Sequence, residues 1–206
     1  MNKIALSLRV FGLALAFAGF STAASAAADI SAGQATAGVC AGCHGMDGNS
    51  FNPAWPKLAA QHPGYLVKQL ADFKAGDRTN AIMAPMAMGL SPQDMENVAA
   101  YFAAQKKSAG NADASGTSVG ELIYRSGNLD SGVTACTACH GADAAGNPAA
   151  GFPVLGSQHA AYTQAQLKAF ASGERSNDSA KMMQMIASKL TDAEIQAVAA
   201  YIEGLK

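Results

Sequence analysis

Two stretches of this sequence share one pattern of residues: Val39-Cys40-Ala41-Gly42-Cys43-His44-Gly45 and, 96 residues later, Ala135-Cys136-Thr137-Ala138-Cys139-His140-Gly141. Each contains Cys-x-x-Cys-His, which is the attachment pattern of a c-type haem. The two thiols add across the vinyl groups of the porphyrin, and the adjacent histidine is then held close enough to ligate the iron. The sequence therefore predicts two covalently bound haem c groups, one held by Cys40, Cys43 and His44 and the other by Cys136, Cys139 and His140.

Other uses of cysteine pairs fit this pattern less well. All four cysteines fall into the two pairs, and a histidine follows each pair although the chain has only 4 histidines. A zinc site of two such pairs normally spaces them by roughly 15–20 residues, and a dithiol redox site leaves the histidines unexplained. Because no cysteine remains for a disulfide, we expect each haem to supply part of the core around it.

The first 28 residues have the three-part layout of a secretory signal peptide. Lys3 and Arg9 form a basic start, an apolar run covers residues 10–20, and a small-residue end carries Ala24-Ser25-Ala26. The apolar run is shorter than the roughly 18–20 residues that a spanning helix needs. We therefore expect cleavage near Ala26 and export to the periplasm, the side of the bacterial inner membrane on which c-type haem is attached.

The charge of the chain argues against one class of partner. It carries 14 basic and 15 acidic residues, and removal of the signal peptide leaves 12 and 15. No run of basic residues is present. Nucleic acid is therefore not an expected partner.

The chain is a duplication of one domain. Gln61-His62-x-x-Tyr65 returns as Gln158-His159-x-x-Tyr162 at a spacing of 97, and Ala99-Ala100-Tyr101 returns as Ala199-Ala200-Tyr201 at a spacing of 100. The segment between the copies is small, polar and glycine-containing, as a linker is. We expect a first domain at 29–107, a linker at 108–117 and a second domain at 118–206.

Each copy has helical patterns only. Leu66, Leu70 and Phe73 share one helical face, and Gly76 marks the end of that helix. Later helices are expected to begin with the caps Ser91-Pro92 and Thr191-x-x-Glu194. No stretch alternates between apolar and polar residues as a strand does. The predicted fold class is all-α.

The sixth ligand of each iron decides what the protein does, because an open position permits catalysis whereas a methionine or second histidine suits electron transfer. Methionines cluster in both copies, at Met83, Met86, Met88, Met182, Met183 and Met185. Met83 and Met183 each lie seven residues before an equivalent leucine, which favours this pair as ligands. The spacing of 97 pairs Met86 with Met183 instead, so Met86 stays an alternative to Met83. A bis-histidine site that uses His62 and His159 is a second alternative.

Two further repeated positions have open roles. Pro56 and Pro153 either orient the haem histidines through their carbonyl groups or form ordinary turns. Arg78 and Arg175 either pair with haem propionates or lie on the surface.

Together these motifs resemble those of the dihaem cytochrome c4 family. Each copy has a Cys-x-x-Cys-His turn, a Pro-x-Leu segment, a Gln-Leu helix, an Arg-x-Asn turn, a methionine loop and a closing Ala-Ala-Tyr helix. The resemblance implies two tandem class I cytochrome c domains related by pseudo-twofold symmetry. It implies periplasmic electron transfer from a bc1-type complex toward a haem-copper terminal oxidase, with loose membrane association and no enzymatic activity. The iron ligands that it implies are His44, Met83, His140 and Met183.

Two alternatives to an independent carrier remain. One is the cytochrome subunit of a larger dehydrogenase, such as a flavocytochrome c sulfide dehydrogenase. The other is a dihaem peroxidase, which needs one vacant iron position. We also expect the two haem potentials to differ, because the methionine loops differ: Ala84-Pro85-Met86 stands in one and Gln184-Met185-Ile186 in the other.

Overall fold

The computed structural model describes residues 27–110 and 118–206. The expected cleavage site at Ala26, nearly all of the expected signal peptide and most of the expected linker lie outside these ranges. Within them the chain forms helices and turns without a strand, and two isolated β-bridges join Asn128 to Val133 and Asn147 to Phe152. The all-α prediction is confirmed.

The first half, residues 27–110, is built around one long pair of helices and three shorter ones. In chain order the helices are α1 (Ile30–Ala37), α2 (Ala41–His44), α3 (Pro63–Ala75), α4 (Met83–Met88) and α5 (Pro92–Ala103). The second half, residues 118–206, repeats this order with one added 3-10 turn: α6 (Ser118–Ser126), α7 (Thr137–His140), α8 (Ala160–Ser172), η2 (Ser179–Lys181), α9 (Met182–Ala187) and α10 (Asp192–Gly204).

The helix ends follow the expected local signals. Helix α3 ends at Gly76, whose φ of +89° lies in the left-handed region that glycine adopts without strain. Ser91 and Thr191 each form a capping box, with Asp94 and Glu194 respectively, at the start of α5 and α10. These caps satisfy amide groups that the first turn of a helix leaves unpaired.

The first and last helices of each half cross at a glycine. A Cβ on Gly33 of α1 would lie 2.0 Å from the Asn97 carbonyl oxygen of α5, and one on Gly120 of α6 would lie 2.2 Å from that of Ala197 in α10. Only glycine permits so close an approach. The crossing helices cover two separate cores, with Val98, Tyr101 and Phe102 in the first and Tyr124, Val198 and Ile202 in the second.

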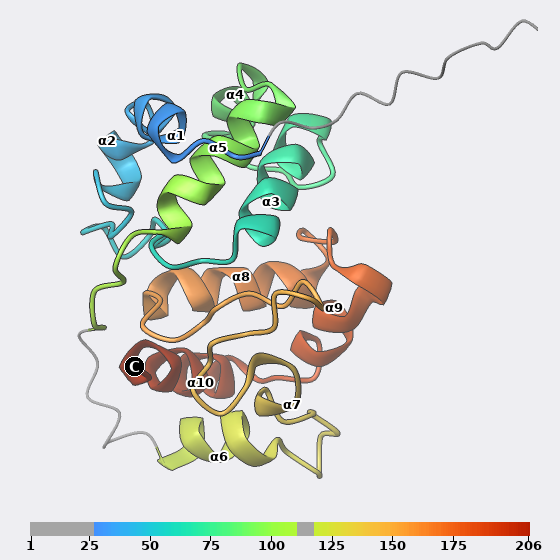
Figure 1. Cartoon of the computed structure of the whole chain (residues 1–206). Helices are drawn as coiled ribbons and strands as arrows, with labels where there is room; N and C mark the ends of the chain where they lie inside the picture. The colour runs from blue at the N-terminus through green and yellow to red at the C-terminus, as the bar shows by residue number, and fades with distance from the viewer. Residues whose placement is uncertain (1–26, 111–117) are drawn as a thin grey trace, which may run out of the picture.

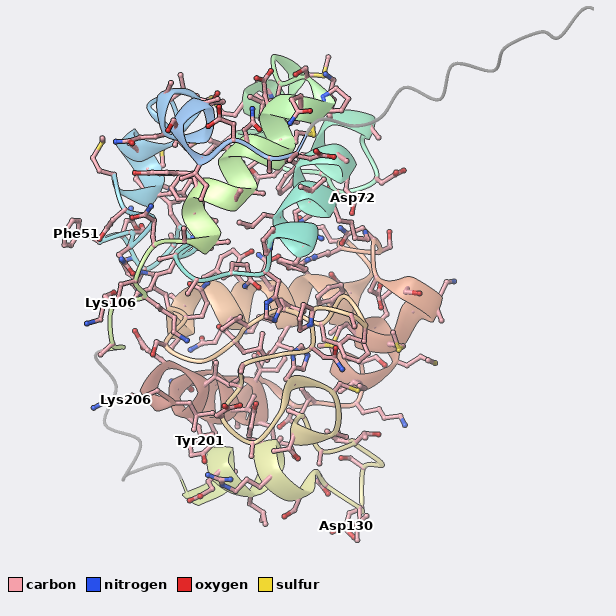
Figure 2. The ribbon with its side chains drawn as sticks, viewed as in Figure 1. Phe51, Asp72, Lys106, Asp130, Tyr201 and Lys206 are labelled. Atoms are coloured by element: carbon pink, nitrogen blue, oxygen red, sulfur yellow. The ribbon has the colours of Figure 1, made fainter. Side chains whose placement is uncertain are left out.

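The two halves stack on one another, with α8 along the side of the second half that faces the first (Figure 1). Asp72, near the end of α3, lies at this boundary and accepts a hydrogen bond from Asn177 of the other half (Figure 2). The start of the expected linker is held in place, because Asn49 bonds the backbone of Lys106 and Ser108 at 2.9 and 2.7 Å. Within the two described ranges, no helix combines the length and apolar character needed to cross a membrane.

Candidate haem sites

The two short helices α2 and α7 arrange the Cys-x-x-Cys-His residues within one turn. The backbone amide of His44 donates to the Cys40 carbonyl, and that of His140 to the Cys136 carbonyl, each at 2.9 Å. Gly45 and Gly141 then end the turn with φ of +82° and +80°. Each motif therefore presents its two thiols and its imidazole from a single compact turn.

A proline carbonyl orients each of these histidines. His44 Nδ1 lies 2.8 Å from the Pro56 carbonyl oxygen, and His140 Nδ1 lies 3.1 Å from that of Pro153. A carbonyl only accepts, so Nδ1 carries the proton and Nε2 is left with a lone pair for a metal. Of the two roles left open for these prolines, the structure shows the first.

Burial favours the neutral form of both imidazoles. Desolvation lowers the pKa of His44 and of His140, although the hydrogen bond to the proline carbonyl raises it in part. Both side chains are buried. A neutral imidazole is the form that ligates iron, so the protonation state and the orientation agree.

No disulfide joins any of the four cysteines, all of which lie inside the described ranges. Desolvation, followed by the neighbouring Cys43, raises the pKa of Cys40, and burial raises the pKa of Cys136 to about 11. In the described part of the chain no three His, Cys, Asp or Glu side chains converge on a point that would hold a metal ion, which is what the zinc alternative requires. Two thiols beside an oriented neutral imidazole fit a covalently bound haem c in each half.

The methionine loops place Met83 and Met183 in equivalent positions. Each lies four residues before a fully buried alanine, Ala87 in α4 and Ala187 in α9. Both methionines are half-buried, whereas the Met86 side chain is 40% exposed. Met86 corresponds to Ile186 in this register. The placement therefore favours Met83 over Met86 as the partner of Met183.

The rival ligands His62 and His159 are occupied elsewhere. They are the N-cap residues of α3 and α8. His62 Nε2 lies 2.9 Å from the Ala145 carbonyl oxygen and His159 Nε2 lies 2.7 Å from that of Ser50, each in the opposite half. The Nε2 atom of each ring therefore serves the contact between the halves.

The structure also reveals roles that the sequence pattern did not assign. The guanidinium of Arg78 is buried and donates to the Tyr162 hydroxyl and to Gln166 at 3.0 and 2.7 Å, and that of Arg175 donates to Tyr65 and Gln69, each at 3.0 Å. Both arginines thus cross between the halves. Their repetition at a spacing of 97 was the available signal, but a repeat alone does not tell a contact between domains from one within a domain.

Two helical domains, each with a Cys-x-x-Cys-His turn, an oriented neutral histidine and a methionine loop, define a tandem c-type cytochrome. The profile of the cytochrome c family matches residues 30–106 and 131–206. Over 206 residues that span both proteins completely, the chain is 47% identical to cytochrome c4 of Pseudomonas aeruginosa. The crystal structure of reduced recombinant cytochrome c4 from Pseudomonas stutzeri superposes with a TM-score of 0.84 at 47% identity, covering 87% of this chain and 100% of that one.

The chain therefore belongs to the cytochrome c4 family. It is a dihaem electron-transfer protein with two covalently bound haem c groups, as expected. A more distant relative, at 40% identity over 168 residues, is the thiosulfate dehydrogenase electron acceptor of Stutzerimonas stutzeri; the match covers 79% of this chain and 77% of that protein.

Proposed function

We propose that the protein is a periplasmic carrier that takes single electrons from a bc1-type complex and delivers them to a haem-copper terminal oxidase. In this proposal His44 and Met83 ligate one iron, and His140 and Met183 ligate the other. The observation that carries it is the matched geometry of the two halves: in each, a neutral histidine is held by a proline carbonyl and a half-buried methionine stands four residues before a buried alanine.

When bound, the haem irons supply the one-electron ferric/ferrous couple. The protein residues set how easily that couple is reduced. A methionine thioether favours the ferrous state and so raises the potential. Burial of both imidazoles excludes water from the histidine side, and the fixed Nδ1 hydrogen bonds keep the rings from turning between oxidation states. With two protein ligands at each iron, no position is left for a substrate.

The proposed location follows from the expected signal peptide and from the chemistry of the four thiols. Free cysteines in an oxidising compartment normally form disulfides, and thioether bonds to haem remove that hazard. Fractionation of cells that express the full chain tests this proposal. Haem-stained protein of the cleaved mass in the periplasmic fraction is expected, and uncleaved protein in the membrane fraction would contradict the proposal.

The ligand assignment is tested by the optical spectrum of the dithionite-reduced protein before and after carbon monoxide. An unchanged spectrum is expected, because carbon monoxide binds only where an iron position is vacant or weakly held. A change at half or more of the haem would contradict the carrier function. Stopped-flow reduction by an isolated bc1 complex, followed by oxidation by a terminal oxidase, tests the proposed partners.

A second candidate function has one observation in its favour. The thiosulfate dehydrogenase electron acceptor among the relatives suggests that a protein of this kind serves a dehydrogenase rather than a bc1-type complex. The chain would then co-purify with, or be reduced directly by, a catalytic partner such as the flavoprotein subunit of a sulfide dehydrogenase. Purification from the native host separates the two functions: a protein that purifies alone and exchanges electrons with the bc1 complex supports the carrier, and a stable complex with a dehydrogenase, such as a flavoprotein, supports the subunit.

A further inference from the structure

One peptide group in the first half contacts both the haem histidine and the opposite half. The Pro56 carbonyl accepts from His44 Nδ1 at 2.8 Å. The amide N–H of the same peptide group belongs to Lys57 and donates to Gln158 Oε1 at 2.9 Å. Gln158 stands in the second half, just before α8. A single peptide group thus joins His44 to a side chain of the other half.

The second half contains the mirror arrangement. The Pro153 carbonyl accepts from His140 Nδ1 at 3.1 Å, and the Val154 amide of the same peptide group donates to Gln61 Oε1 at 2.9 Å. Gln61 stands in the first half, just before α3. One series of hydrogen bonds therefore links the first-half histidine to the second half, and the other links the second-half histidine to the first half, across the same interface.

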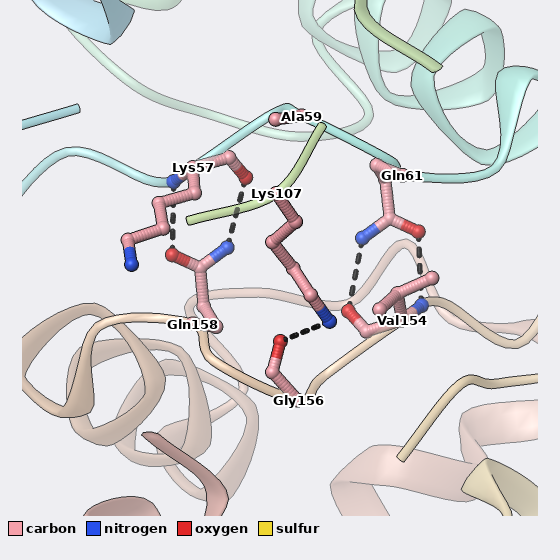
Figure 3. Close-up of a pocket in the computed structure, with 7 residues that line it drawn as sticks. All are labelled: Lys57, Ala59, Gln61, Lys107, Val154, Gly156 and Gln158. Atoms are coloured by element: carbon pink, nitrogen blue, oxygen red, sulfur yellow. Dashed lines mark hydrogen bonds between the residues drawn. The ribbon is translucent and has the colours of Figure 1, made fainter. Parts of the chain in front are cut away.

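Both glutamines are held firmly in these positions. Gln158 Nε2 donates to the Lys57 carbonyl and Gln61 Nε2 donates to the Val154 carbonyl, each at 2.9 Å (Figure 3). Each Oε1 also accepts from the backbone amide of the next residue at 3.0 Å. The two amides, with Lys57, Lys107 and Gly156, line a small pocket between the halves. Such contacts fix both the position and the flip of the two side-chain amides.

We propose that Gln158 tunes the haem of the first half and that Gln61 tunes the haem of the second half, each through the peptide group that holds the opposite haem histidine. This inference rests on the proposed ligation of iron by His44 and His140. The glutamines are positioning residues: they act on the histidines and do not touch the haem ligand atoms themselves.

The sign of the effect follows from hydrogen-bond cooperativity. A peptide group whose N–H is donated becomes a better acceptor at its carbonyl, by about 10–30% per bond. A stronger acceptor draws the Nδ1 proton and makes the imidazole a more basic ligand. A more basic ligand stabilises ferric iron and lowers the potential. Loss of the glutamine is therefore expected to raise the potential of the haem in the opposite half.

The test replaces each glutamine with methionine, which has a similar length but neither accepts nor donates as an amide does. In a spectroelectrochemical titration of the holoprotein, Gln158→Met is expected to raise the potential of the first-half haem by about 30 mV. This shift corresponds to a roughly threefold change in the equilibrium constant for reduction, at 59 mV per tenfold for one electron. Gln61→Met is expected to raise only the second-half haem by a similar amount. The two components are assigned with variants of Met83 and Met183, each of which shifts one component.

Gln166→Met is the matched control. It removes the hydrogen bond that Gln166 accepts from Arg78 across the same interface, and one from Arg175 within the second half, without touching either proline peptide group. Gln166→Met is therefore expected to produce no potential shift that is confined to the haem of the opposite half. A second readout is the Nδ1 proton resonance of His44 and His140 in the ferrous protein, which is expected to move upfield only in the histidine opposite the replaced glutamine.

The two glutamine variants test the proposal independently, so failure of one to fold leaves the other decisive. Potentials that match the control, or two haems that shift together in each variant, would overturn the proposal. Failure of the proposed carrier function is recognised separately, since the reduced wild-type protein would then already bind carbon monoxide.

Discussion

The two halves of the molecule share the parts that hold a haem and differ in the parts that surround the methionine loop. In the first half, Asn80 Oδ1 accepts from the Met83 amide at 2.9 Å. In the second half, Asp178 Oδ2 accepts from the Met183 amide at 2.8 Å. A neutral amide thus caps one loop and a carboxylate caps the other, so the loops differ in charge close to the expected ligand.

The approach to the two loops differs as well. Helix α9 follows directly on η2, where Ala180 and Lys181 have φ of +52° and +57°, and α4 has no such turn before it. The residue that follows the histidine-binding proline is Lys57 in the first half, after Pro56, and Val154 in the second half, after Pro153. The shared parts therefore specify a haem site, and the differing parts place different charges around each iron, which is the expected source of two unequal potentials.

The largest expected effect comes from removal of a methionine ligand. Met83→Ala and Met183→Ala are each expected to open one iron, so that carbon monoxide changes the spectrum of about half the haem. The potential of that haem should fall, with a change of well over tenfold in the equilibrium constant for its reduction, because the thioether no longer favours the ferrous state.

Met86→Ala is the control for these variants. It removes a methionine from the same short helix and is expected to leave both the carbon monoxide response and the potentials unchanged. The reverse outcome, a response to Met86→Ala and none to Met83→Ala, would assign Met86 as the ligand.

The next effect concerns stability. Gly33→Ala and Gly120→Ala each place a methyl group within 2.2 Å of a carbonyl oxygen at the crossing of the first and last helices. Overpacking of this kind costs about 1–3 kcal/mol, so each variant should lower the thermal midpoint of its own half. Gly64→Ala in α3 is the control, because a methyl group there meets nothing within 4 Å. Equal loss in the control would show that the crossings are not close-packed.

A smaller effect is expected from the two loop caps. Asp178→Asn keeps an oxygen for the Met183 amide but removes a charge, so the potential of the second-half haem should rise by roughly 30–60 mV, or threefold to tenfold. Asn80→Asp should lower the potential of the first-half haem for the same reason. Asp130→Asn is the control, because it removes the same single negative charge from an exposed position in the second half (Figure 2). If Asp130→Asn raised the potential of the second-half haem as much as Asp178→Asn does, the effect would come from net charge and not from the loop cap.

The smallest effect is expected from Lys57→Met. Removal of this buried ammonium group favours ferric iron nearby, so the potential of the first-half haem should fall. The expected change in the equilibrium constant for reduction is roughly twofold. Titration of the exposed variant Lys106→Met gives the background for loss of one positive charge in the same half. A fall no larger than that background would exclude a local role for Lys57.

The haem-attachment turns and the helix caps could be predicted from the sequence because each depends on residues close together in the chain. Cys40, Cys43 and His44 lie within one turn, and Ser91 bonds Asp94 three residues later. The choice between Met83 and Met86 stayed open because the position of three additional residues in the second copy was unknown. The structure places them between Asn177 and Met183, around η2, so the spacing has already reached 100 at the methionines.

The contacts between the halves could not be predicted in this way. Gln61 and Gln158 stood out as repeated residues, but their partners lie 93 and 101 residues away in the chain. Which peptide groups they meet depends on how the two halves stack, and no local pattern records that. The same is true of Arg78 and Arg175, whose guanidinium groups are buried only because the halves meet.

The most direct test of two similar sites with different tuning is a spectroelectrochemical titration of the wild-type holoprotein. Two one-electron components with distinct potentials are predicted, each accounting for half of the absorbance change. A single component that fits two identical one-electron sites would contradict this account, because the differences around Asn80, Asp178 and Lys57 would then have no effect on the irons.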